Sequence, residues 1–282
     1  MEPYKSRWGE TPQTVEDHIN MIMGRYIETK DVFRCFTPTV GIFPYEACLE
    51  NVLKAKDWDR LNNFIYQENC IRSFVSRMNG DSHYWAFLEM LEALAVGNIK
   101  AFELLLPERI ETVTNIFPLY RPATNMLMGL WRKDSGVLEY AVPRAKKFAD
   151  GKRPQWERAT AAYLLAIYDK NPKEAGIQLE IICKAAMRAD FDSAYKTLFV
   201  PAHGLYQLAA YLWDVELFQQ LPMPNHKSFS KEYAVWRNTH EVHPVLFTES
   251  DSADVRRNGC NCSFLCLNES AGMSPQCDLP VR

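Results

Sequence analysis

The sequence predicts an all-α fold, an array of antiparallel helix hairpins arranged as a tetratricopeptide-like solenoid. Three observations predict it. Apolar residues recur at helical spacing, this spacing is interrupted at intervals by capping residues, and no stretch shows the alternation of several strands. We expect residues 1–249 to form the helical-repeat domain and residues 250–282 to form a loosely ordered tail rich in Cys, Ser and Asn.

The stretch Leu91–Leu106 (LEALAVGNIKAFELLL) shows how the helical spacing is interrupted. Gly97 suits the left-handed conformation that ends many helices, and Asn98 can accept hydrogen bonds from the first backbone N–H groups of the next helix. Asp81 or Ser82 can cap the preceding helix. We therefore predict a tight helix–turn–helix whose first apolar face consists of Tyr84, Phe87, Leu88, Leu91 and Leu94.

Four other turns repeat this pattern, with capping residues at Asp57, Asp134, Asn171 and Asp214. Together with Asn98 these caps are, in chain order, 41, 36, 37 and 43 residues apart, which is typical of a helical-repeat array. After Asn171, a proline occupies the first helical position and Glu174 is placed to reach back to the cap. The hairpins are not repeated in sequence and lack the tetratricopeptide signature, so we expect a degenerate array.

Prolines mark the connections between the hairpins. The two prolines within Phe117–Pro122 predict that a helix ends there, and Pro143 is expected to kink or shorten the helix that follows Asp134. Leu221–Phe229 (LPMPNHKSF) is expected to be a loop. Thr39–Phe43 (TVGIF) is the best strand candidate, but it is too isolated to form a sheet.

Composition and charge exclude several classes of protein. The chain has 282 residues, 47% of them apolar and 24% charged, as in globular proteins, and its net charge of −3 provides no basic footprint for nucleic acid. We recognise no signal peptide and no apolar run of about 18 residues, so we expect a cytoplasmic protein without a membrane span. Reduced, buried thiols are expected at Cys35, Cys48, Cys70 and Cys183.

Two motifs could hold a metal ion, and we expect neither to do so. In His240-Glu241-Val242-His243 the histidines are three residues apart, whereas the zinc-protease motif needs four, and a proline follows at once. A second group could supply thiolates but lacks the paired CxxC knuckle; it consists of Cys260, Cys262, Cys266 and Cys277. An incidental set of cysteines in the tail is the better interpretation.

The sequence contains no motif of a known catalytic site. Asp190-Phe191-Asp192 resembles a metal-binding DxD triplet, but no phosphate-binding glycine loop accompanies it, and we expect Asp192 or Ser193 to cap a helix that starts at Tyr195. His203 is expected to be a half-buried histidine with its hydrogen bonds satisfied. GxSxG, GxxxxGK[ST] and GxGxxG are missing. We therefore predict no enzyme and no cofactor; an active site assembled from distant residues is the alternative.

The segment Asp190–Phe247 combines three features. A short stretch leads into a Val-Pro-Ala step, an Ala/Leu-rich helix follows, and a proline loop lies beyond the next turn (FDSAYKTLFVPAHGLYQLAAYLWDVELFQQLPMPNHKSFSKEYAVW). This pattern resembles the C-terminal part of the bacterial immunity protein 49 family. The resemblance covers roughly a quarter of the chain, and the cysteine-rich tail is not part of the family pattern.

The resemblance implies a protein made beside a secreted toxin in a contact-dependent or type VI-like competition system. Such a protein binds its cognate toxin directly and stoichiometrically, without turnover or a cofactor. A mildly acidic chain suits a basic partner, and nucleic-acid-cleaving toxins are of that kind. The alternatives are a helical-repeat adaptor that holds a peptide or protein in its groove, and a helical enzyme with a dispersed site.

The expected contact region is the loop Met187–Tyr195 (MRADFDSAY), which mixes acidic side chains with an aromatic residue. Asp190, Asp192 and Tyr195 belong to this loop. Trp156 and Arg158 begin the preceding hairpin and are expected to lie nearby. These five residues form the predicted partner-binding site.

Overall fold

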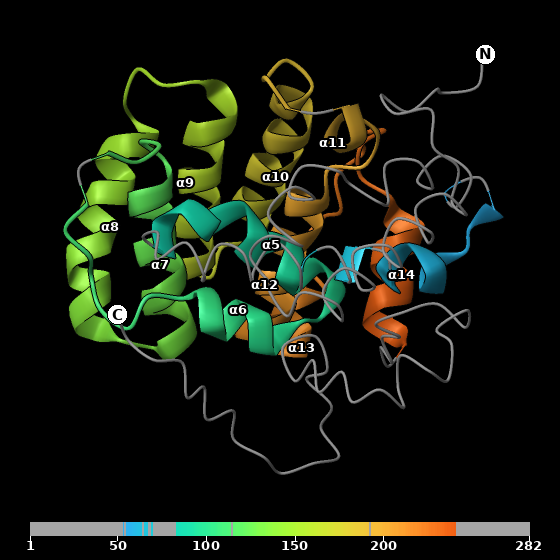
Figure 1. Ribbon diagram of the computed structural model, residues 1–282, viewed down its shortest axis with the longest axis horizontal. Helices are drawn as coiled ribbons and strands as arrows, with labels where there is room; N and C mark the ends of the chain where they lie inside the picture. Colours follow the sequence, from blue (N-terminus) through green and yellow to red (C-terminus); the bar gives the residue numbers. More distant parts are fainter. Residues whose placement is uncertain are drawn as a thin grey trace, which may run out of the picture.

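The structure is a computed structural model that describes residues 53, 55–63, 65–66, 69, 83–113, 115–191 and 193–240. Every secondary-structure element within these residues is helical, which confirms the all-α class (Figure 1). From His83 onward, in chain order, they are η2 (His83–Ala86), α5 (Phe87–Val96), α6 (Ile99–Leu105), α7 (Tyr120–Arg132), α8 (Ser135–Ala149), α9 (Gln155–Tyr168), α10 (Pro172–Ala186), α11 (Ser193–Thr197), α12 (Val200–Leu212), α13 (Val215–Phe218) and α14 (Lys231–Thr239).

All five predicted turn residues cap the start of a helix. Each side-chain oxygen accepts a hydrogen bond from the backbone N–H three residues later, over 2.8–3.2 Å, at Asp57, Asn98, Asp134, Asn171 and Asp214. Four of the caps follow directly on a left-handed residue, which is Lys56, Gly97, Lys133 or Lys170. The predicted back-contact of Glu174 is not formed, because its carboxylate accepts a hydrogen bond from Gln178 at 2.7 Å.

The prolines agree with the prediction only in part. A helix begins, rather than ends, near Phe117–Pro122, since α7 starts at Tyr120 and holds Pro122 in its first turn. Proline is tolerated there because the first N–H groups of a helix have no intrahelical partner. Helix α8 continues past Pro143 to Ala149 and is therefore not shortened. The loop Leu221–Phe229 is confirmed, as no helix or strand is assigned within it.

The helix pairs do not all stack on their neighbours in sequence. The pairs α7/α8 and α9/α10 lie side by side through contacts between α8 and α9. Helix α5, in contrast, packs most extensively on α12, which belongs to the last pair. At their crossing Gly204 brings the two backbones together, because a Cβ atom added there would lie 1.9 Å from the Leu91 carbonyl oxygen. The first and last pairs thus share one core with the middle of the array.

His203 on α12 packs against Phe229 and against Tyr233 of α14. It is 1% exposed, so the half-buried position predicted for it is wrong. Its ring stacks on Phe229 with centroids 4.1 Å apart, and its Nε2 atom accepts from the backbone N–H of Ser230 at 3.2 Å. Its Nδ1 atom has no hydrogen-bond partner, and burial lowers the pKa of the imidazole to about 3.

Several sequence-based expectations fall outside the described residues. These are the strand candidate Thr39–Phe43, the caps Asp81 and Ser82, Asp192, His243, the tail 250–282 and all cysteines except Cys183. Cys183 is a buried free thiol, and burial raises its pKa to about 12. None of the helices described is long and apolar enough to cross a membrane.

Candidate functional site

A cavity of about 610 Å³ opens at the end of the array where α7 and α9 begin and α10 ends. We call it the aromatic pocket and define it by six of its lining residues, which are Phe117, Tyr120, Trp156, Glu157, Asp190 and Phe191. They come from three separate parts of the chain. The pocket therefore exists only because the pairs α7/α8 and α9/α10 stand side by side.

Aromatic rings in contact with one another form the walls of the aromatic pocket. Trp156, in the first turn of α9, stacks on Phe117 with ring centroids 6.0 Å apart. It also meets the ring of Phe191 edge-on at 5.0 Å. The ring of Tyr120 packs against Phe117 in a tilted arrangement, with centroids 5.0 Å apart. The faces of aromatic rings carry the partial negative charge of their π-systems, which makes such a wall attractive to a cation.

Trp85 extends this aromatic surface beyond the pocket. Its ring meets Tyr120 edge-on at 6.4 Å, and 44% of the residue is exposed. Large exposed aromatic side chains next to a pocket are typical of protein-binding hot spots. The apolar periodicity that begins at Tyr84 does not single out Trp85, because position 85 does not belong to the predicted apolar face.

Glu157 is the chemically unusual member of the aromatic pocket. The residue is 4% exposed, and its Oε2 atom is buried without a hydrogen-bond partner. Burial raises the pKa of this carboxyl group, against a smaller lowering by the charge of Arg153. A buried, unpaired carboxylate is costly unless a cation or a donor completes it. Glu157 directly follows Trp156 in sequence, and no pattern in the sequence singled it out.

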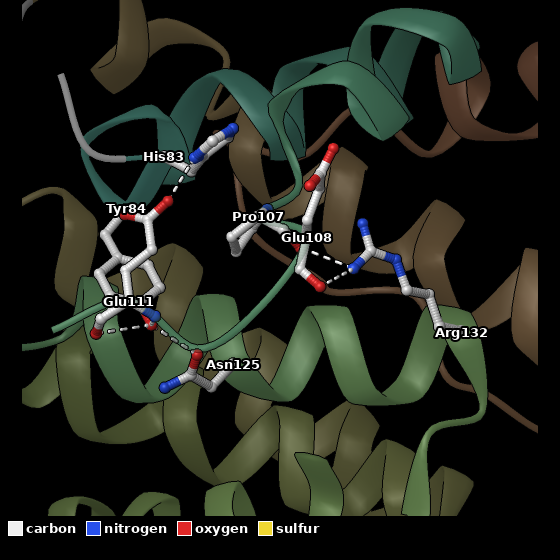
Figure 2. Close-up of polar contacts among 7 residues, drawn as sticks. All are labelled: His83, Tyr84, Pro107, Glu108, Glu111, Asn125 and Arg132. Carbon is white, nitrogen blue, oxygen red and sulfur yellow. Dashed lines mark hydrogen bonds and ion pairs between the residues drawn. The ribbon is translucent and has the colours of Figure 1, made fainter. Parts of the chain in front are cut away.

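The segment that supplies Phe117 is held by hydrogen bonds on both of its sides (Figure 2). The guanidinium of Arg132 donates to the carbonyl oxygen of Pro107 at 2.7 Å, and the backbone N–H of Glu111 donates to the hydroxyl of Tyr84 at 2.9 Å. The carboxylate of Glu111 is also paired with the ring of His83. These contacts fasten the first part of the connection between α6 and α7, from Pro107 to Glu111.

The structure brings together part of the predicted partner-binding site. Trp156 and Asp190 both line the aromatic pocket, and Asp190 is exposed at its rim. Arg158 is partly buried on α9 and is not among the lining residues; its Nε atom has no partner. Asp192 lies outside the described residues.

Tyr195 is not the surface aromatic residue that the predicted site requires. It is 4% exposed, and its hydroxyl donates to the carboxylate of Glu92, which is itself buried. The reason is that α11 turns this side chain toward α5, where it joins the core. Phe191, four residues earlier, is the aromatic residue of this loop that faces the aromatic pocket.

Comparisons of this chain with protein families, with curated proteins and with solved structures found no match. Among the residues that the structure describes, no three His, Cys, Asp or Glu side chains are grouped as a metal ion would require. The aromatic pocket itself has the chemistry of a binding site for a cation. It offers aromatic rings, which attract cations, and the carboxylates of Glu157 and Asp190; Arg188 lines the same pocket and partly offsets their charge.

Proposed function

We propose that this chain is a protein-binding protein whose partner inserts a basic side chain, Lys or Arg, into the aromatic pocket. The observation that carries the proposal is the Glu157 carboxylate, buried beside aromatic rings with one oxygen unpartnered. A guanidinium or ammonium group supplies the missing hydrogen bond and the opposite charge. Cation–π contact with the rings adds about 0.5–2 kcal/mol.

We further propose that the partner is a cognate secreted toxin and that the chain neutralises it in the cytoplasm as a stoichiometric inhibitor. The resemblance to the immunity protein 49 family supports this assignment. The electrostatics are compatible with it, because nuclease toxins carry basic surfaces, this chain has a net charge of −3, and the aromatic pocket is lined by two acidic residues, Glu157 and Asp190, against one basic residue, Arg188. The side-by-side packing of the pairs α7/α8 and α9/α10 also supports the proposal, because it presents several helices to one partner.

The test is co-expression with the toxin encoded beside this gene, followed by calorimetric titration of the two purified proteins. We expect protection of the cell and a stoichiometric complex. Glu157→Gln is expected to weaken binding by roughly 2 kcal/mol, about 30-fold. The matched control is Glu139→Gln on the exposed face of α8, which removes the same charge outside the pocket and is expected to leave affinity unchanged.

Two results would contradict the proposal in different ways. Equal affinities of the Glu157→Gln and Glu139→Gln variants remove the aromatic pocket as the contact site. A chain that neither binds nor protects against the toxin is not its immunity protein. If that same chain binds Arg- and Lys-containing peptides in a Glu157-dependent manner, it is the helical-repeat adaptor that the sequence left as the alternative.

A further inference from the structure

A second cavity, of about 360 Å³, lies on the other side of the segment 116–122 from the aromatic pocket, between α7 and α8. We call it the arginine pocket and define it by Ile116, Arg121, Asn125, Tyr140, Arg144 and Phe148. Two guanidinium groups and a carboxamide line it, and none of its described lining residues is acidic. The charge of this pocket is therefore opposite to that of its neighbour.

Asn125 places unused hydrogen-bond donors at the arginine pocket. The residue is 0% exposed, and its Oδ1 atom accepts from the hydroxyl of Tyr84 at 2.8 Å. That bond fixes the orientation of the amide, and Figure 2 shows the nitrogen directed away from Tyr84 and Glu111. The Nδ2 atom has no partner, nor has the buried Nε atom of Arg121. Two donors at one pocket thus lack an acceptor.

Arg144 is held in place without its charge being neutralised. Its guanidinium lies over the ring of Tyr140, 3.5 Å from the centroid, and one nitrogen donates to the Tyr140 carbonyl oxygen at 2.8 Å. No ion pair of Arg144 occurs among the described residues. The first turn of α7, where Arg121 lies, has no side-chain cap, so the positive end of the helix dipole adds to the same field.

From this arrangement we propose that the arginine pocket binds an oxyanion group, a carboxylate or a phosphate. Such a group accepts from the planar fork of Arg144, from Arg121 and from the Asn125 amide at once. It thereby supplies the acceptor that the two buried donors lack. No covalent step is involved, and the site does not require the toxin or the aromatic pocket.

The test uses the isolated protein with inorganic phosphate and, separately, acetate as probes. Side-chain N–H signals of Asn125 and of the two arginines are followed by NMR at constant ionic strength. We expect saturable shifts with at least one probe. Arg144→Gln is expected to weaken that binding about 10-fold, as the loss of one charge-assisted hydrogen bond predicts.

Lys146→Gln is the matched control, because it removes one positive charge from the exposed surface of the same helix and does not line the pocket. A response to phosphate alone identifies a phosphate site, and a response to acetate identifies a carboxylate site. Shifts that do not saturate with either anion, or that weaken equally in both variants, overturn the proposal. Because no partner is present, failure here leaves the proposed toxin binding unaffected.

Discussion

At the scale of a single residue, the Glu157 carboxylate lowers the stability of the isolated protein at neutral pH, whereas in the proposed function it strengthens partner binding. Its pKa is raised by burial, so the folded protein binds a proton more tightly than the unfolded chain does. The stability that this difference contributes is greatest below the unfolded pKa of about 4.5 and is lost as the pH rises through the folded pKa. At neutral pH the charged carboxylate therefore lowers the free energy of unfolding of the isolated protein.

We accordingly predict that Glu157→Gln raises the melting temperature at pH 7 while weakening partner binding. The melting temperature of the variant should also depend less on pH between 4.5 and neutrality than that of the original protein. Thermal melts across this range, with Glu139→Gln as the control, provide the measurement. A lower melting temperature combined with unchanged binding would show that the carboxylate has a structural role.

Burial of His203 is expected to make the folded protein less stable as the pH falls. Its folded pKa of about 3 is lower than the ordinary value of 6.5, because the buried ring disfavours the charged form. As the pH falls below 6.5, His203 becomes protonated in the unfolded chain but stays neutral in the folded protein. The unfolding free energy therefore decreases by up to about 1.4 kcal/mol per pH unit.

We predict that His203→Gln lowers stability at pH 7 by disturbing the stack on Phe229, yet flattens the decrease between pH 6.5 and pH 4. Urea unfolding at several pH values measures both effects. Parallel pH profiles for the two proteins would assign the acid sensitivity to other groups.

Tyr195 stabilises the fold through its hydroxyl. We predict that Tyr195→Phe costs about 1–3 kcal/mol of unfolding free energy, because the buried carboxylate of Glu92 loses a donor. Toxin affinity, measured well below the melting temperature, should not change. A weakened complex with unchanged stability would restore the original interpretation of Tyr195 as a contact residue.

At the scale of elements, the crossing of α5 and α12 depends on a single missing side chain. A Cβ atom at position 204 would lie 1.9 Å from a backbone oxygen, which cannot rotate away as a side chain could. We predict that Gly204→Ala lowers the unfolding free energy by about 1–3 kcal/mol or more.

Gly136→Ala on exposed α8 is the control, and it should be neutral or stabilising by up to ~1 kcal/mol, because its nearest contact is 3.4 Å away. Chemical denaturation measures the unfolding free energy of both variants. Equal values would contradict the close approach of the α5 and α12 backbones at Gly204.

For the whole molecule, both pockets and the exposed Trp85 lie near the first turns of α7 and α9. Tyr168 is similarly exposed at the other end of α9, roughly 18 Å along the helix from Trp156. We predict that Trp85→Ala weakens the toxin complex by about 2 kcal/mol or more, whereas Tyr168→Ala does not. Both variants should melt close to the original protein, since both side chains are largely outside the core. Binding titrations compare the toxin affinities of the two variants. A larger loss of affinity for Tyr168→Ala would place the partner at the other end of α9.

The sequence by itself determined the helices and their turns, because a capping hydrogen bond spans only three residues. The caps from Asp57 to Asp214 could be located for that reason. It did not determine the role of the prolines near Phe117, since a proline at a helix start and one after a helix end look alike locally.

Only the tertiary structure decided which pairs of helices meet and which side chains face a pocket. The contact of α5 with α12 joins segments about 110 residues apart, and it depends on the shape of both surfaces rather than on periodicity. Trp156 and Asp190 were correctly placed near each other, because they flank one hairpin. Glu157, Phe117 and Tyr120 were not identified, and Tyr195 was assigned to the surface, because burial of a side chain results from packing between distant parts of the chain.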